Sequence, residues 1–286
     1  MKSYAAFLAE HFEGKIQKIP VDTQHVCPNR DGTCGRGGCT YCLNGAFSPD
    51  AQKAGLSVHK QIARGRKFFA KKYSDMRYLA YFQSHTPTHA PISVVIAEVA
   101  EAISEADVAG VVISTRPDCL PNELLNWLTG LGKPVLMEIG GESSHDATLL
   151  RINRCHTWAM TTDAVQRCAA AGVPVGLHLI MGLPGEDEEM MLETIRRVNG
   201  LPVSTVKLHH LQILRGTALA RDFEGGKCDD MVRFTPESYA ALCRKILDIL
   251  RDDIAVERFV ASAPGDMLIA PRWGIKPGAF NKMIGI

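Results

Sequence analysis

Short apolar segments alternate along this chain with longer segments of helical periodicity, and this alternation restricts the fold more than any other feature. Each apolar segment ends in polar or glycine residues, as the strands of a buried sheet do. A repeated strand–helix order predicts a parallel sheet with right-handed crossovers. The predicted strands are residues 15–21, 77–83, 110–115, 134–139, 173–181 and 205–213, and the predicted helices are residues 51–73, 91–107, 121–130, 160–171 and 186–199.

The number of repeats decides between a closed and an open barrel. Eight strand–helix units close a barrel of this type, whereas six leave it open. We therefore predict an α/β fold, a partial (β/α)6 TIM-like barrel over residues 1–220. Residues 221–286 are predicted to form a short C-terminal extension packed on the barrel. This extension contains a Gly225-Gly226 linker, a helix near 236–252 and a Pro- and Gly-rich tail with apolar runs at 256–261 and 267–273.

Polar residues follow the predicted strands at the end where a parallel barrel carries its chemistry. They are a cysteine loop after the first strand, Gln83 and Ser84 after the second, Thr115–Asp118 after the third, Gly140–Ser144 after the fourth, and His209 with His210 at the sixth. We expect these groups to meet at one edge of the sheet, with one of the two adjacent histidines facing inward.

The overall charge does not favour binding to nucleic acid or to a membrane. Formal net charge is +1 and hydrophobic content is 46%, a globular composition. No run of 18 apolar residues predicts a membrane span, and the first residues do not resemble a signal peptide. The odd number of cysteines, nine, disfavours a complete disulfide framework. These features predict a cytoplasmic protein with reduced thiols and no membrane partner.

The segment CPNRDGTCGRGGCTYC, residues 27–42, holds four of the nine cysteines. Cys39 and Cys42 form a C-x2-C pair, and Cys27 precedes them across a glycine-rich stretch that lets the backbone wrap around a bulky group. Three thiolates from one loop can bind three irons of a [4Fe–4S] cluster and leave the fourth iron open. Alternatively, all four cysteines, including Cys34, could hold one structural zinc ion, although their spacing is awkward for that metal. Unligated thiols are the third alternative.

The motifs of this chain resemble those of radical S-adenosylmethionine (SAM) enzymes. In that family three cysteines bind the cluster and an aromatic residue, here Tyr41, precedes the last one. The C-x11-C-x2-C spacing is similar to that of the YhcC/YtqA-type family, on the branch with the Elongator catalytic subunit. The supporting segments are CPNRDGT, GRGGCTYC, YLAYFQS, STRPDCLP, RINRCH, HLIMGLPGE, VKLHHLQI and ASAPGDMLIAPRW.

The resemblance implies ligands and cofactors. Cys27, Cys39 and Cys42 would bind a [4Fe–4S] cluster, and Cys34 stands where relatives carry another residue. SAM would chelate the open iron, and one electron, from a donor such as flavodoxin or ferredoxin, would release a 5′-deoxyadenosyl radical. The other cofactor-binding positions, carried over from related radical enzymes, are Tyr41, Gln83, Thr115, Glu142, Arg154, His178, Met181 and Gly182.

Some positions depart from the family pattern. Relatives carry a glutamine where this chain has Glu142, and a glycine where it has Cys155. The HLIMGLPGE segment lacks the GxxxxGK[ST] pattern of a phosphate-binding loop, so no nucleoside triphosphate site is predicted. No catalytic residue and no oligomeric state are assigned.

One segment bears on the substrate. Residues 59–77 hold seven Lys or Arg and one acid, with Phe68, Phe69 and Tyr73 between them. Such a segment is either a solvated helix face or a surface that tracks RNA phosphates. The Elongator-like branch contains modifiers of the tRNA wobble uridine, so the resemblance implies a tRNA partner and a substituent on that base as substrate. The alternatives are a radical enzyme acting on a small metabolite and a non-enzymatic zinc- or RNA-binding module.

Overall fold

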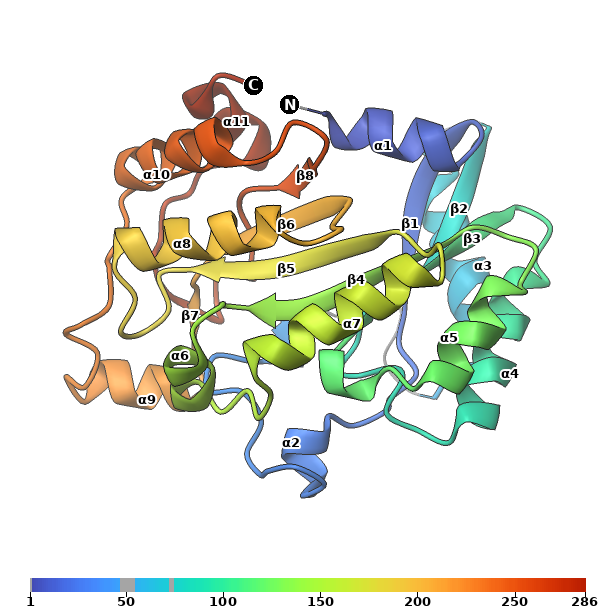
Figure 1. Cartoon of the computed structure of the whole chain (residues 1–286), viewed down its shortest axis with the longest axis horizontal. Coiled ribbons are helices and arrows are strands. Elements are labelled where there is room, and N and C mark those ends of the chain that lie inside the picture. The colour runs from blue at the N-terminus through green and yellow to red at the C-terminus, as the bar shows by residue number, and fades with distance from the viewer. Residues whose placement is uncertain (1, 47–54, 72–74) are drawn as a thin grey trace.

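The computed structural model describes residues 2–46, 55–71 and 75–286. Its centre is one curled sheet of seven parallel strands in the order β1-β2-β3-β4-β5-β6-β8 (Figure 1). The strands are β1 (Lys15–Val21), β2 (Met76–Phe82), β3 (Val108–Thr115), β4 (Val135–Glu142), β5 (Val175–Met181), β6 (Thr205–His210) and β8 (Ala255–Arg258). The predicted α/β partial barrel is therefore confirmed, and the sequence order of the strands is also their spatial order.

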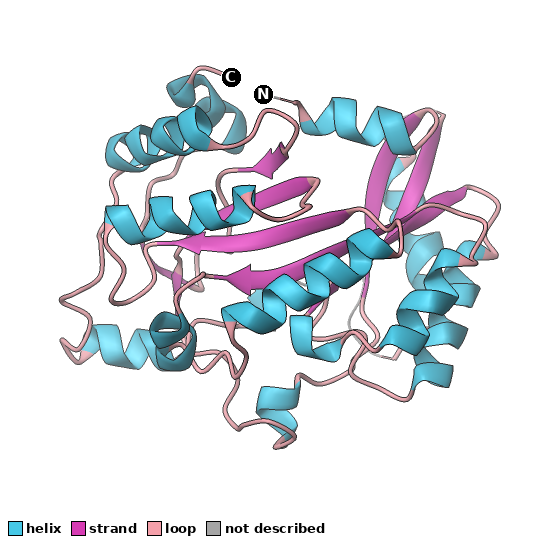
Figure 2. Ribbon diagram, viewed as in Figure 1, coloured by secondary structure: helices cyan, strands magenta, loops and turns pink. Residues whose placement is uncertain are grey.

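Helices cover the outer face of this sheet (Figure 2). They are α3 (Val58–Phe69), α4 (Ile92–Ile103), α5 (Asn122–Thr129), α7 (Trp158–Ala170), α8 (Glu188–Asn199) and α10 (Pro236–Ile249). Short helical segments lie between them: α2 (Pro28–Asp31), η1 (Asn44–Ala46), η3 (Pro117–Cys119), α6 (Asp146–Arg151) and α9 (Ala218–Glu224). Positions 51–54 and 72–73 of the predicted helix 51–73, Tyr73 included, lie outside the described residues.

Local chemistry explains where the helices begin. The side chain of Asp187 accepts a hydrogen bond from the backbone of Met190 and caps α8, whose last turn carries Arg196 and Arg197. These charges match the helix dipole at each end. In α10, Thr235 and Ser238 form a reciprocal capping box directly before the apolar stripe that packs on the sheet.

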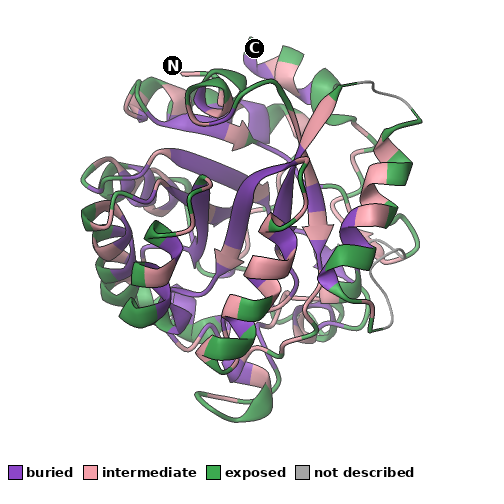
Figure 3. Ribbon diagram, turned by 90° about the vertical axis from the view of Figure 1, so that its right-hand side faces the viewer, coloured by how far each residue is buried: buried purple, intermediate pink, exposed green. Residues whose placement is uncertain are grey.

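Figure 3 shows buried strands under partly exposed helices. Along each strand, the side chains alternate between the outer core and the barrel interior. In β2, Tyr78, Ala80 and Phe82 pack outward in the main core cluster, whereas Leu79 and Tyr81 point to the barrel interior. The alternation follows from the two-residue period of a strand. Helix α1 (Tyr4–His11) contributes Phe7 to the interior cluster and so covers the end of the barrel where the strands begin.

The C-terminal segment completes the sheet as well as packing on it. Strand β8 pairs in parallel with β6, with Thr205 opposite Ala255, so the predicted extension supplies the seventh strand. Farther on, β9 (Leu268–Ala270) pairs antiparallel with β7 (Ile213–Leu214), and α11 (Pro277–Ile284) packs on α10. Within the described ranges no helix has the length and apolar character needed to cross a membrane.

Candidate functional site

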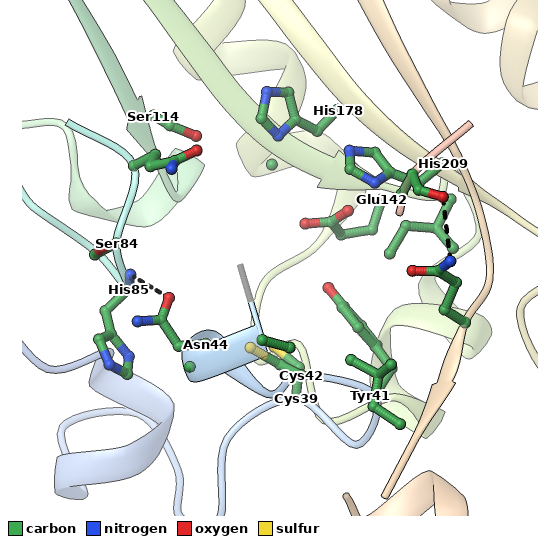
Figure 4. A pocket seen from close by; sticks show the side chains of 18 of the residues that line it. Cys39, Tyr41, Cys42, Asn44, Ser84, His85, Ser114, Glu142, His178 and His209 are labelled. Carbon is green, nitrogen blue, oxygen red and sulfur yellow. Dashed lines mark hydrogen bonds between the residues drawn. The ribbon is translucent and has the colours of Figure 1, made fainter. Parts of the chain in front are cut away.

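A cavity of about 900 Å3 opens where the barrel strands end, and the cysteine loop forms one of its walls (Figure 4). Polar side chains from several strand ends converge on it, because parallel strands present their carboxyl ends at one edge. Of the positions predicted to bind cluster or cofactor, those that line the cavity are Cys27, Cys39, Cys42, Tyr41, Gln83, Thr115, Glu142, Arg154 and His178.

Two predicted cofactor positions lie elsewhere. The Met181 side chain is buried in the main core cluster, and the Gly182 backbone N–H donates to the Met191 sulfur. Neither residue lines the cavity, whereas Ile180, one position earlier on β5, does. Both adjacent histidines of β6 contribute to the lining, but the His210 ring stacks on Trp273 in the outer core cluster, whereas the His209 ring lies beside that of His178. The two rings therefore point to different sides of the sheet, in agreement with the expectation that one of them faces inward.

Backbone turns fold the cysteine loop around its own thiols. Cys27 is the N-cap of α2, and that helix ends at Gly32 in a left-handed conformation with φ of 101°. Gly38 also has a positive φ, 75°, and its missing side chain leaves room for the Arg30 guanidinium, which would lie 2.6 Å from a Cβ. Glycine is required at such a position by conformation and by space. The loop then closes with a Cys42 N–H to Cys39 carbonyl bond of 3.0 Å.

The three thiols that line the cavity are partly or fully buried: Cys39 is buried, and Cys27 and Cys42 are half-buried. Burial, followed by the neighbouring Cys39, raises the pKa of Cys42 to about 11. Burial also raises the pKa of Cys27. Hydrogen-bond donors nevertheless point at Cys39 Sγ: Asn29 Nδ2 at 3.3 Å and Arg154 Nη1 at 3.6 Å. Donors aimed at sulfur stabilise thiolates, so the loop is prepared for charged sulfur once a positive centre offsets the burial.

Cys34 is separated from the other three loop cysteines. It is exposed, it does not line the cavity, and Arg116 Nη2 lies 3.9 Å from its sulfur. Among the residues with a described placement, no three His, Cys, Asp or Glu side chains converge closely enough for a single metal ion. A four-iron cluster is a larger body that holds its thiolates farther apart than one zinc ion does. The residues therefore fit a three-thiolate cluster better than a four-cysteine zinc site.

A pair of opposite charges lies beside the cysteines. Arg154 Nη2 is 2.8 Å from the Gly140 carbonyl oxygen and 3.2 Å from Glu142 Oε1. Glu142 adopts a left-handed φ of 63° at a register shift between β4 and β5, and this bulge turns its carboxylate toward the guanidinium. Buried Arg154 Nε has no hydrogen-bond partner within the described structure. A carboxylate and a guanidinium side by side can receive the ammonium and carboxylate of an amino-acid group.

A network of charged side chains lies beneath the cavity and forms its floor; of its members, Tyr81 and His178 line the cavity, and most of the network was not predicted from the sequence. Glu138, which is 1% exposed, accepts hydrogen bonds from the four donors Lys18 Nζ, Tyr81 Oη, His178 Nε2 and Lys207 Nζ. Burial by itself would raise the pKa of Glu138. The charges of Lys18 and Lys207 outweigh this effect and hold that pKa well below its usual value. The available signal was charge at the inward positions of otherwise apolar strands.

His178 belongs to both the floor and the cavity. Its Nε2 lies 2.7 Å from Glu138 Oε2, which leaves Nδ1 as an acceptor on a neutral ring. Burial, and then the nearby Lys207, lowers the pKa of His178. The His209 ring lies 5.9 Å from it, between centroids, and receives the Arg258 guanidinium at 2.8 Å on Nε2. These groups give the wall opposite the cysteines a mixture of acceptor and cationic character.

Comparison with known proteins places this geometry in a family. The model of the radical SAM superfamily matches residues 25–198, and the model of the radical SAM C-terminal domain matches residues 203–284. YtqA of Bacillus subtilis is 34% identical over 96% of this chain and 86% of that protein. YhcC of Escherichia coli is 35% identical over 93% of this chain and 85% of that protein.

More distant matches share a fold or a part of the sequence. The solved structure of Elp3 from Methanocaldococcus infernus, lacking its N-terminus, has a TM-score of 0.68 at 16% identity and covers 94% of this chain and 62% of that chain. A tRNA uridine(34) acetyltransferase of Methanocaldococcus jannaschii is 29% identical over 40% of this chain and 22% of that protein. The solved structure of Streptococcus suis SuiB bound to S-adenosylmethionine has a TM-score of 0.53 at 9% identity and covers 91% of this chain and 54% of that chain.

Proposed function

The chain belongs to the radical SAM superfamily, and from this premise we propose that it is an enzyme that cleaves SAM reductively at a [4Fe–4S] cluster. When bound, the cluster would supply the electron that splits the sulfonium of SAM into methionine and a 5′-deoxyadenosyl radical. The proposal rests on the separation of Cys34 from the other three cysteines of the loop. Cys27, Cys39 and Cys42 line the cavity and Cys34 does not.

The amino-acid end of SAM would be held by the charge pair beside the loop. Arg154 would pair with its carboxylate and Glu142 with its ammonium, which makes use of the unpartnered Arg154 Nε. Gln83 and Thr115 line the same cavity and would offer polar contacts to the rest of the cofactor. Tyr41 lines the cavity beside Cys39 and Cys42. The contact of Met181 and Gly182 with adenine stays a prediction, and Ile180 is the neighbouring β5 residue that lines the cavity.

The residues of the floor would keep the reaction space rigid and dry. The Glu138 network fixes the orientation of His178 through a short hydrogen bond, and the packed helix α1 closes the far end of the barrel. Excluding water and holding polar groups in place favours reaction of a radical with one chosen hydrogen. An electron donor such as flavodoxin or ferredoxin completes the proposal, as does a cytoplasmic location.

For the substrate we propose a substituent on the wobble uridine of tRNA. Two observations support this choice: the partial similarity to a tRNA uridine(34) acetyltransferase, and the basic outer helix α3. On α3, Lys60 and Lys67 are exposed, whereas Arg66 is paired with Glu105 and Asp107. The cationic surface is therefore smaller than the sequence indicates. A small-metabolite substrate is the competing alternative, and it would require no salt-dependent tRNA binding.

Electron paramagnetic resonance of the anaerobically reconstituted and reduced protein tests the cluster and cofactor. We expect a [4Fe–4S]+ signal that changes when SAM is added, survives Cys34→Ser and disappears with Cys39→Ser. One tightly bound zinc ion lost with Cys34→Ser would instead establish the zinc alternative.

Nucleoside analysis of total tRNA tests the substrate. Deleting the protein should change the substituted wobble uridines, and expression of the chain should restore them, whereas a Cys39→Ser variant should not. Unchanged uridines together with SAM cleavage would leave the small-metabolite alternative.

A further inference from the structure

Two cysteines that the proposed function does not use lie against each other beside the cysteine loop. Cys34 is exposed, and Cys155, on the segment after α6, is half-buried. A Cβ placed on Gly35 would lie 2.8 Å from Cys155 Sγ, so the sulfur rests directly on the Cys34–Gly35 backbone. Burial, and with it the neighbouring Cys155, raises the pKa of Cys34. The fold thus brings together two thiols that are far apart in the sequence.

The backbone at Cys155 is unusual for a residue with a side chain. Its φ is 58°, in the left-handed region, where a non-glycine residue costs roughly 1–2 kcal/mol. This conformation follows a second left-handed residue, Asn153, with φ of 55°. The two turns direct the Cys155 sulfur back over the cysteine loop, toward the Oδ1 of Asn153 at 3.4 Å.

Asn153 connects this pair to the proposed cluster ligands. Its side-chain Nδ2 donates to the carbonyl oxygens of Arg36 and Gly38, each at 2.8 Å. Its own carbonyl oxygen accepts a bond of 2.8 Å from Asn29, whose Nδ2 also donates to Cys39 Sγ. The segment that carries Cys155 therefore holds the loop through hydrogen bonds, and a disulfide from Cys155 to Cys34 would add a covalent connection between them.

We propose that Cys34 and Cys155 form a redox-active dithiol, a modification site at which a small-molecule disulfide converts the two thiols into one intramolecular disulfide. The exposed Cys34 thiolate attacks a sulfur of the small disulfide, forms a mixed disulfide and releases one small thiolate. The Cys155 thiolate then attacks the Cys34 sulfur and releases the second. Two protein thiols are oxidised, one external disulfide is reduced, and the two thiol protons pass to the two small thiolates.

The charge around Cys34 suits the first step. Arg116 Nη2 is 3.9 Å from the Cys34 sulfur and stabilises its thiolate, although burial and Cys155 leave the pKa of Cys34 raised overall. Exchange should therefore accelerate as pH rises toward that pKa. Cys119 is a second neighbour, but its thiol is buried and directed at Asp118 Oδ1. The geometry selects Cys155 as the resolving thiol.

Anaerobic treatment of the reconstituted protein with oxidised glutathione at mildly alkaline pH tests the proposal. Peptide mass spectrometry without reductant should find Cys34 linked to Cys155, and dithiothreitol should reverse the link. The visible absorption of the cluster should persist, because its proposed ligands are not consumed. Iron release to a chelator should be several-fold slower in the linked protein, because the loop is tied at both sides.

Matched variants make the result specific. Cys34→Ser and Cys155→Gly should abolish the link, and the glycine change also removes the left-handed strain, so it is not expected to unfold the chain. Gly35→Ala should block the link while keeping both thiols, whereas Cys228→Ser should leave it intact. Stable glutathionylation of Cys34, a link from Cys34 to Cys119, or no modification would overturn the proposal. The reaction needs no SAM, so its outcome is independent of the proposed function.

Discussion

Lys207 Nζ lies 2.7 Å from Glu138 Oε2 inside the barrel, where the two side chains are 4% and 1% exposed. Lys18 Nζ approaches the other carboxylate oxygen of Glu138 at 2.7 Å, and Glu257 contacts both lysines. Charges this deep are tolerated only when they are mutually paired. The pairing joins β1, β4, β6 and β8, so it also connects the first strand to the last.

Neutralising the Glu138 carboxylate is expected to destabilise the fold. Glu138→Gln leaves two buried ammonium groups facing one remaining acid, and breaking a buried pair in this way typically costs about 3–5 kcal/mol. Urea denaturation followed by circular dichroism measures the change in free energy of unfolding. Glu189→Gln, at an exposed ion pair with Arg196, is the control and should change little. Equal effects at the two positions would show that the interior network does not stabilise the barrel.

The stability of the chain should fall between pH 7 and pH 5, in part through His156. Burial, and then Arg154 and Arg116, lowers the pKa of His156 to about 2. The unfolded ring protonates near its ordinary value of 6.5, so below that pH the unfolded state binds more protons and gains relative stability. The contribution of this residue is therefore complete above pH 6.5 and is lost by up to about 1.4 kcal/mol per pH unit below it.

Denaturation at several pH values in wild type and His156→Gln measures this contribution. The variant should show a shallower loss of stability on acidification. Burial lowers the pKa of His210 to about 4, so this residue also reduces the stability on acidification, by the same amount in both proteins. The difference in free energy of unfolding between wild type and variant therefore reports on His156. An unchanged slope in the variant would mean that His156 takes up its proton without unfolding.

Gly140→Ala should weaken SAM binding without removing the cluster. A Cβ at this position would lie 2.3 Å from Arg154 Nη2 and 2.8 Å from Glu142 Oε1, so the guanidinium must move away. Loss of one charge-assisted hydrogen bond lowers affinity about tenfold or more. Equilibrium binding of SAM to the reconstituted protein gives the Kd. The control is Gly278→Ala, where a Cβ would meet nothing within 4 Å. Retained affinity in Gly140→Ala would remove Arg154 from the proposed cofactor site.

Removing exposed charges from α3 should reduce the salt dependence of tRNA binding. Each phosphate contact that is lost lowers the slope of log affinity against log salt by about 0.7–0.9. Lys60→Gln with Lys67→Gln should therefore flatten the slope by more than one unit on that estimate. Fluorescence anisotropy of labelled tRNA at several salt concentrations gives both slopes. Lys282→Gln on α11, well separated from α3 in Figure 1, is the control. An unchanged slope in the double variant would place tRNA on another face.

Local patterns of the sequence were sufficient for the architecture. Strands such as β5 and β6 were predictable because buried parallel strands are continuous apolar runs, and their helices because caps and periodicity are local properties. The assignment of Cys27, Cys39 and Cys42 as cluster ligands came from the resemblance to radical SAM enzymes, and it stays a prediction. The seventh strand, β8, was harder to predict because it is only four residues long and pairs with a strand some 50 residues earlier.

What only the tertiary structure decided is which distant side chains meet. The sequence by itself determined a parallel α/β barrel with a cysteine loop at the strand ends, because those features depend on residues that are neighbours in the chain. The Glu138 network joins residues from six strands or loops, and the contact of Cys34 with Cys155 depends on two left-handed turns. Curling of the sheet brings these groups together, and no local pattern encodes the distance between them.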